Sequence, residues 1–229
     1  MKAMILAAGR GERMRPLTDH TPKPLLKVGG NPLIVWHIER LAQAGIREIV
    51  INHAHLGAQI EQSLGNGAQW DVSIEYSPEV NALETAGGIA NALPLLGNAP
   101  FCVINGDVFT DYDFERLAHS ANAVIDGDAL AHLVLVDNPP QHPNGDFSIF
   151  NGQLTNVGEP MYTFSGIGVY QPAMFAGITR GDAAKLAPLL RDAIDQGKAT
   201  AEYYKGVWHD IGTPQRLTEL DAWLNKHDK

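Results

Sequence analysis

Short apolar runs alternate with segments of helical periodicity through the first half of the chain. The segment 32–44 places its apolar residues roughly on one helical face, begins at Pro32 and is followed by Gly45. The expected strands are Ala3–Leu6, Glu48–Asn52, Val72–Tyr76 and Phe101–Asn105, and the expected helices are Pro32–Ala44, Leu56–Leu64 and Thr85–Leu93. This alternation predicts an α/β fold with a doubly wound, mostly parallel sheet that binds ligands at the carboxyl ends of its strands.

The second half of the chain has a different pattern. Two short runs flank Asn151-Gly152, a pair typical of a type I′ hairpin turn. The expected strands are Ala129–Val136, Asp146–Phe150, Leu154–Val157 and Thr163–Tyr170, and the expected helices are Ala183–Gln196 and Pro214–Lys226. We therefore expect a small antiparallel lobe and a closing C-terminal helix, within a single domain whose two halves are residues 1–125 and 126–229.

Composition and charge narrow the classes of protein. The 229 residues include 17 basic and 26 acidic ones, so the net charge of −9 argues against a general nucleic-acid or acidic-membrane binder. Cys102 is the only cysteine, which excludes an intrachain disulfide. The first apolar run is too short for a signal peptide and no apolar stretch could span a bilayer, which predicts a cytoplasmic protein.

A loop rich in glycine and arginine follows the first expected strand. Gly9 and Gly11 lack a Cβ, so backbone N–H groups there can approach phosphate oxygens closely. The cationic side chains in or near this loop are those of Arg10, Arg13, Arg15 and Lys23. The spacing does not fit a P-loop, and Met14 stands where the dinucleotide fingerprint needs its third glycine. An anionic nucleotide is the expected ligand.

Two aspartates lie in segments suited to a divalent ion. Asp107 follows a strand and a glycine, where a carboxylate can hold a hard cation against phosphate oxygens. Asp210 lies in the run Trp208–Pro214, which also fits a strand-to-helix turn with Thr213 as the N-cap. Thr213 can cap the following helix while Asp210 binds a metal ion, so the two interpretations are compatible.

The segment Leu6–Leu25 resembles the signature of the sugar-1-phosphate nucleotidylyltransferases, which join a nucleoside triphosphate to a sugar phosphate and release pyrophosphate. The resemblance implies that Arg13 lies over the β- and γ-phosphates, that Lys23 contacts the α-phosphate, and that two aspartates hold Mg²⁺. The implied catalytic residues are Arg13, Lys23, Asp107 and Asp210, the last two as metal ligands. The implied nucleotide-binding residues are Ala8, Gly9, Gly11, Glu12, Arg13, Lys23, Thr85 and Gly88. The resemblance thus implies that residues 1–125 form the nucleotide-binding half and residues 126–229 the sugar-binding half.

For the sugar, the resemblance implies contacts from Asn105, Gly145, Glu159 and Ser165. Many members of the family have Glu-Lys-Pro where this chain has Glu159 followed directly by proline, and that lysine reaches the sugar phosphate. Here either another cation such as Arg191 or Lys205 substitutes, or the metal carries more of the charge. We expect direct attack on the α-phosphorus without a general base, because a sugar phosphate is already ionised.

Two further runs, 105–109 and 162–168, indicate which substrates within this family the chain uses. They most resemble the family's uridylyltransferases for N-acetylmuramic acid 1-phosphate, while the mannose-1-phosphate guanylyltransferases share the early motifs and are the nearest alternative. A cytidylyltransferase for phosphocholine or a similar non-sugar phosphate can also share the first loop. A non-catalytic nucleotide-sensing subunit should have lost a metal aspartate or the lysine of Pro-Lys, and this chain has them all. We expect a monomer, with no nucleic-acid or membrane partner.

Overall fold

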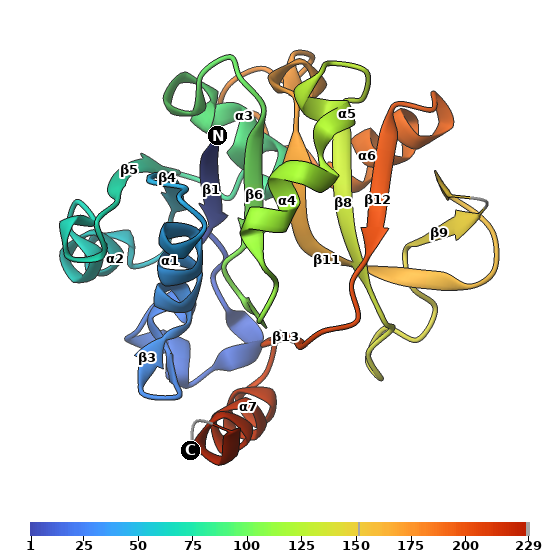
Figure 1. The fold of residues 1–229 in the computed structure, drawn as a ribbon. Coiled ribbons are helices and arrows are strands. Elements are labelled where there is room, and N and C mark those ends of the chain that lie inside the picture. Colours follow the sequence, from blue (N-terminus) through green and yellow to red (C-terminus); the bar gives the residue numbers. More distant parts are fainter. Residues whose placement is uncertain (151, 228–229) are drawn as a thin grey trace.

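A computed structural model describes residues 1–150 and 152–227 of the chain. Within these residues the largest sheet has nine strands. They are β1 Lys2–Leu6, β4 Glu48–His53, β5 Ser73–Pro78, β6 Phe101–Asn105, β8 Ala131–Val136, β9 Phe147–Phe150, β10 Gln153–Thr155, β11 Met161–Tyr170 and β12 Ala199–Tyr203. The strands run in the order β10-β9-β11-β6-β1-β4-β5, with β8 against β11 and β12 against β8 (Figure 1).

The predicted parallel sheet is confirmed. Strand β1 pairs in parallel with β4 and β6, and β4 pairs in parallel with β5. Strands β9 and β10 form the expected antiparallel hairpin, although the turn residue Asn151 lies outside the described residues. Strand β11 pairs antiparallel with β6, so the strands of the second half extend the central sheet.

Helices cover both faces of this sheet. They are α1 Leu33–Gln43, α2 Gly57–Leu64, α3 Glu84–Leu96, α4 Phe114–Ser120, α5 Asn122–Ile125 and α6 Leu186–Asp195, whereas α7 Pro214–His227 packs on a separate apolar cluster. Because successive strand residues point to opposite faces, Ala3 and Ile5 pack with α1, α2, α4 and α5, while Met4 packs with α3 and α6. None of the helices in residues 1–150 and 152–227 is long and apolar enough to cross a membrane.

Two small sheets lie beside the carboxyl edge of the central one. They pair β2 (Lys27–Val28) with β3 (Asn31–Pro32), and β7 (Val108–Thr110) with β13 (Trp208–Asp210). Helix α7 begins just after β13, with Thr213 Oγ1 accepting a hydrogen bond from Arg216 N at 3.3 Å, as expected of an N-cap. It packs through Leu220 and Leu224 onto an apolar cluster that includes Val28. Helix α7 therefore lies against β2, in the N-terminal part of the chain, as Figure 1 shows.

Candidate active site

The glycine-rich loop after β1 is folded against the Pro-Lys segment. Gly11 has a φ of 65°, and a Cβ there would lie 2.9 Å from Thr18 Cγ2 and 3.2 Å from Lys23 Cβ. The hydroxyl of Thr18 donates a hydrogen bond to the carbonyl oxygen of Gly11 at 2.8 Å. A glycine is needed because both the backbone conformation and the close contact exclude a side chain.

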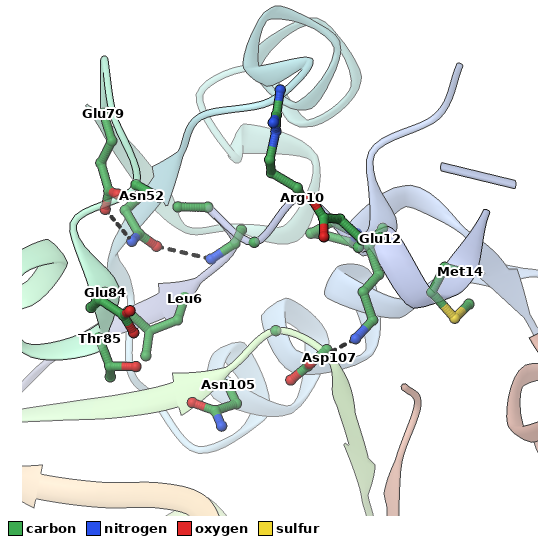
Figure 2. Close-up of a pocket in the computed structure, with 18 of the residues that line it drawn as sticks. Leu6, Arg10, Glu12, Met14, Asn52, Glu79, Glu84, Thr85, Asn105 and Asp107 are labelled. Atoms are coloured by element: carbon green, nitrogen blue, oxygen red, sulfur yellow. Dashed lines mark hydrogen bonds and ion pairs between the residues drawn. The ribbon is translucent and has the colours of Figure 1, made fainter. Parts of the chain in front are cut away.

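A cavity of about 580 Å³ opens above this loop at the carboxyl edge of the sheet. Figure 2 shows Glu84 and Thr85 on one side and Arg10 and Glu12 on the other, with Asn105 and Asp107 along the edge between them. The predicted nucleotide-binding residues that line it are Ala8, Gly9, Gly11, Glu12, Arg13, Lys23 and Thr85. Sequence reasoning missed Asn52 and Glu79, which also line it.

Lys23 and Asp107 form an ion pair at the floor of this cavity. The distance from Lys23 Nζ to Asp107 Oδ2 is 2.6 Å, and the lysine side chain is only 9% exposed against 40% for the aspartate. A partly buried pair is screened less by salt than a surface pair. The lysine ammonium has three N–H groups and donates one of them to Asp107 Oδ2. Two lysine N–H groups and the second carboxylate oxygen therefore stay available to a ligand in the cavity.

The two candidate metal aspartates lie next to each other in the fold: Asp107 directly precedes β7, and Asp210 is the last residue of its partner strand β13. Asp210 of β13 is the register partner of Val108, and Ile211 N donates a hydrogen bond to the Asp107 carbonyl oxygen at 2.9 Å. The Asp210 carboxylate forms an ion pair with Arg216 of α7, whose Nη1 also donates to the Asp210 carbonyl oxygen at 3.1 Å. Sequence reasoning missed Arg216.

Two arginines converge on Gly212, two residues after Asp210. A Cβ on Gly212 would lie 3.0 Å from Arg216 Nη2 and 3.2 Å from Arg13 Nη2. The guanidinium groups of Arg13, in the phosphate loop, and of Arg216, in α7, therefore both lie close to Gly212, where a side chain would crowd them. This arrangement concentrates positive charge at one end of the larger cavity, in a chain of net charge −9.

A buried histidine supports the strand that follows Asp107. His37 Nε2 donates a hydrogen bond to the Val108 carbonyl oxygen at 2.8 Å, and His37 Nδ1 has no partner among the described residues. Burial, more than any nearby charge, lowers the pKa of His37 to about 4. The neutral imidazole thus fixes β7 from below the site, a role that no motif in the sequence indicates.

A second cavity, of about 220 Å³, lies on the other side of Asn105 and Asp107, which line both cavities. Asp210, Ser165 and Trp208 also line it. The Ser165 hydroxyl donates to the Val134 carbonyl oxygen at 2.7 Å, and Trp208 Nε1 donates to the Ser165 carbonyl oxygen at 2.9 Å. Ser165 therefore shapes this cavity through the backbone as well as lining it.

Some predicted site residues line neither cavity. Gly88 is buried in α3, Gly145 packs against the backbone of Tyr162, and Glu159 is exposed on the loop before β11. The two candidate substitutes for the missing lysine also lie elsewhere. The Arg191 guanidinium lies 5.3 Å from the Phe147 ring and Lys205 Nζ lies 5.4 Å from the Tyr203 ring.

The amino-acid sequence and the fold both match known proteins. A family model described as Nucleotidyl transferase matches residues 2–227. The chain is 56% identical over 227 residues to N-acetylmuramate alpha-1-phosphate uridylyltransferase of Neisseria meningitidis serogroup B, and the match covers 97% of each chain. It is 31% identical to a mannose-1-phosphate guanyltransferase of Aspergillus oryzae, of which it spans only 62%.

The fold of the chain also matches that of a solved structure. The crystal structure of a Bacillus anthracis protein assigned as a glucose-1-phosphate thymidylyltransferase, in complex with sucrose, superposes with a TM-score of 0.85 and 25% identity. That match covers 98% of this chain and 95% of the other. Together with the family model over nearly the whole chain, these matches show that the chain belongs to the nucleotidyl transferase family.

Proposed function

We propose that the chain transfers the uridylyl group of UTP to N-acetylmuramic acid 1-phosphate and releases pyrophosphate. The observation that carries this proposal is the 56% identity, across 97% of both chains, to a protein named for that activity. A mannose-1-phosphate guanylyltransferase is the second candidate, supported by a relative at 31% identity. The reaction class is the same for both candidates, so they differ in base and sugar.

The layout of the two cavities supports the division of substrates. The larger cavity has cationic side chains at one end, which suits a triphosphate, and the smaller one suits a sugar. Because Asn105 and Asp107 line both, the reacting phosphates would meet beside them. We assign the nucleotide to residues 1–125 and the sugar to residues 126–229. We further propose that the chain acts as a cytoplasmic monomer, without nucleic-acid or membrane partners.

Mg²⁺ is the proposed cofactor, with Asp107 and Asp210 as the protein ligands. The described residues contain no cluster of three or more potential ligands, and Mg²⁺ typically takes one or two carboxylates together with substrate phosphates and water. The pairing of β7 with β13 holds Asp107, which directly precedes β7, close to Asp210 of β13, and among the described residues each carboxylate forms one ion pair. The donor set therefore fits the ion. When bound, Mg²⁺ would neutralise the charge that develops on the α-phosphate and the leaving pyrophosphate.

The chain's own residues supply positioning and charge. Lys23 has N–H groups left to donate to the α-phosphate while it holds Asp107, and Arg13 lines the same cavity, within reach of the β- and γ-phosphates. An oxygen of the sugar phosphate attacks the α-phosphorus in line, and the bond from that phosphorus to the β-phosphate oxygen breaks. The attacking oxygen is already ionised, so no side chain has to remove a proton.

The proposal is tested by pyrophosphate release over a grid of substrates. Each of UTP, GTP, CTP and dTTP is combined with the 1-phosphates of N-acetylmuramic acid, N-acetylglucosamine, glucose and mannose, and with phosphocholine. The proposal predicts the highest kcat/KM for UTP with N-acetylmuramic acid 1-phosphate. A maximum for GTP with mannose 1-phosphate would favour the second candidate. No release from any pair would favour a nucleotide-sensing subunit.

A further inference from the structure

An amide–carboxylate bridge crosses the carboxyl edge of the sheet beside the larger cavity. Asn52 Oδ1 accepts a hydrogen bond from Ala7 N at 2.8 Å, and Asn52 Nδ2 donates to Glu79 Oε1 at 2.7 Å (Figure 2). Ala7 follows β1, Asn52 lies in β4 and Glu79 follows β5. These three strands are neighbours in the sheet, so the bridge ties together their three ends.

The same carboxylate also holds the start of α3. Glu79 Oε2 accepts a hydrogen bond from Leu83 N at 3.2 Å, and Glu79 N donates to the His53 carbonyl oxygen at 2.8 Å. Leu83 directly precedes Glu84 and Thr85, which line the wall opposite the phosphate loop. A chain of hydrogen bonds therefore runs from one wall of the cavity to the other.

The burial of this bridge shows that its polar groups are used inside the protein. Asn52 is 3% exposed and Glu79 is 8% exposed. No cationic side chain among the described residues forms an ion pair with Glu79, so only N–H donors compensate its charge. A buried carboxylate without a cation is costly unless hydrogen bonds satisfy it. Both Glu79 oxygens are satisfied in this way before any ligand enters.

Gly88 explains how α3 can pack directly on the bridge. A Cβ at this position would lie 2.7 Å from Glu79 Oε1 and 2.9 Å from Asn52 Nδ2. Its φ is not in the left-handed region, so the close approach, rather than the backbone conformation, excludes a larger residue. The resemblance to the family implied that Gly88 contacts the nucleotide, whereas Gly88 packs against Glu79 and Asn52 and does not line the cavity.

We propose that the Asn52–Glu79 bridge sets the spacing between the phosphate loop and the start of α3, and that it thereby fixes the width of the nucleotide cavity. Asn52 and Glu79 are positioning residues in this account, and it rests on the proposed function only in taking a nucleoside triphosphate as the ligand of that cavity. Loss of the bridge weakens nucleotide binding. It leaves the sugar phosphate largely unaffected, because the second cavity lies beyond Asn105 and contains neither bridge residue.

An exchange of the two side-chain types tests the bridge without changing net charge. Asn52→Asp alone sets two carboxylates against each other, and Glu79→Gln alone leaves one hydrogen bond of the bridge unmade. In the double variant Asn52→Asp/Glu79→Gln, the new carboxylate accepts from Ala7 N and from the new amide. The new amide oxygen accepts from Leu83 N. Every hydrogen bond of the bridge is therefore restored, and only the one between residues 52 and 79 has its donor and acceptor exchanged.

The measurement is calorimetric titration with nucleotide and Mg²⁺ in the absence of sugar phosphate. The wild-type chain is first titrated with UTP, GTP, CTP and dTTP, and the tightest binder becomes the probe, so an error in the proposed base does not affect this test. We expect each single variant to raise the Kd about tenfold or more, which corresponds to about 1.4 kcal/mol. The double variant should return to within about threefold of wild type, and the KM for the sugar phosphate should stay near the wild-type value in all three.

Glycine variants give an independent test in the same titration. Gly88→Ala should raise the Kd for the nucleotide, whereas Gly177→Ala should not, since a Cβ on Gly177 meets nothing within 4 Å. A double variant that binds as weakly as the single ones would overturn the proposal, because a restored bridge would then fail to restore nucleotide binding. Single variants that bind like wild type would overturn it as well.

Discussion

Buried His37 should make the folded protein labile in acid. The side chain lies in α1 with 1% exposure, and its Nε2 donates to the Val108 carbonyl oxygen beneath the strand that follows Asp107. Burial lowers the pKa from 6.5 in an exposed histidine to about 4. Below about pH 6.5 the unfolded chain therefore binds a proton that the folded chain does not, and the free energy of unfolding falls as the pH falls.

The size of this effect follows from the two pKa values. Each pH unit between 6.5 and 4 is equivalent to about 1.4 kcal/mol, so His37 should remove about 2 kcal/mol of stability by pH 5 and about 3 kcal/mol by pH 4. The stabilising state, with the imidazole neutral, is complete above about pH 7. A loss of this size is a large fraction of the stability of an ordinary domain.

Urea denaturation of the wild type and of His37→Gln across this pH range isolates the contribution of His37 to the pH dependence of the free energy of unfolding. Glutamine can still donate an N–H to the Val108 carbonyl oxygen, but it does not titrate. We expect the variant to be less stable than wild type at neutral pH and to lose less stability on acidification, by about 3 kcal/mol at pH 4. The half-buried His209, whose pKa burial also lowers, is common to both proteins and cancels in the comparison. Equal losses in the two proteins would refute this reasoning.

Three further predictions concern the site itself. Gly11→Ala should raise the KM for the nucleotide because its Cβ would meet Thr18 Cγ2 at 2.9 Å, whereas Gly30→Ala, also at positive φ but with nothing within 4 Å, should affect only thermal stability. Asp107→Asn should lower kcat about a hundredfold and weaken the dependence of the rate on added Mg²⁺, and a titration with the metal at saturating substrate checks both. Trp208→Phe removes the hydrogen bond to the Ser165 carbonyl oxygen, so steady-state kinetics should show a higher KM for the sugar phosphate and an unchanged one for the nucleotide.

The central strands and the phosphate loop could be predicted because their signals are local. Strands β1, β4 and β6 are buried on both faces and contain short apolar runs, and the glycines of the loop come two residues or more after β1. The predicted cationic residues Arg13 and Lys23 do line one cavity, because they lie in two 3₁₀ turns of the same short stretch after β1. Their roles in the reaction stay predictions.

The contacts between distant segments could not be predicted. Strands β7 and β13 have three residues each and pair across about a hundred positions, so neither has a period to detect. The same limit applies to the Asn52–Glu79 bridge and to His37, whose importance depends on burial alone. Motif likeness also selected Gly88, Gly145 and Glu159, which line neither cavity, because a motif names a residue without saying which surface it faces.

The central claim is that this chain makes a uridylyl sugar from UTP and N-acetylmuramic acid 1-phosphate. The most direct measurement is mass spectrometry of the products when the purified chain is given Mg²⁺ with UTP and GTP together, and with the 1-phosphates of N-acetylmuramic acid and mannose together. The account predicts UDP-N-acetylmuramic acid as the main sugar nucleotide, formed in equal amount with pyrophosphate. GDP-mannose as the main product, or no sugar nucleotide at all, would contradict it.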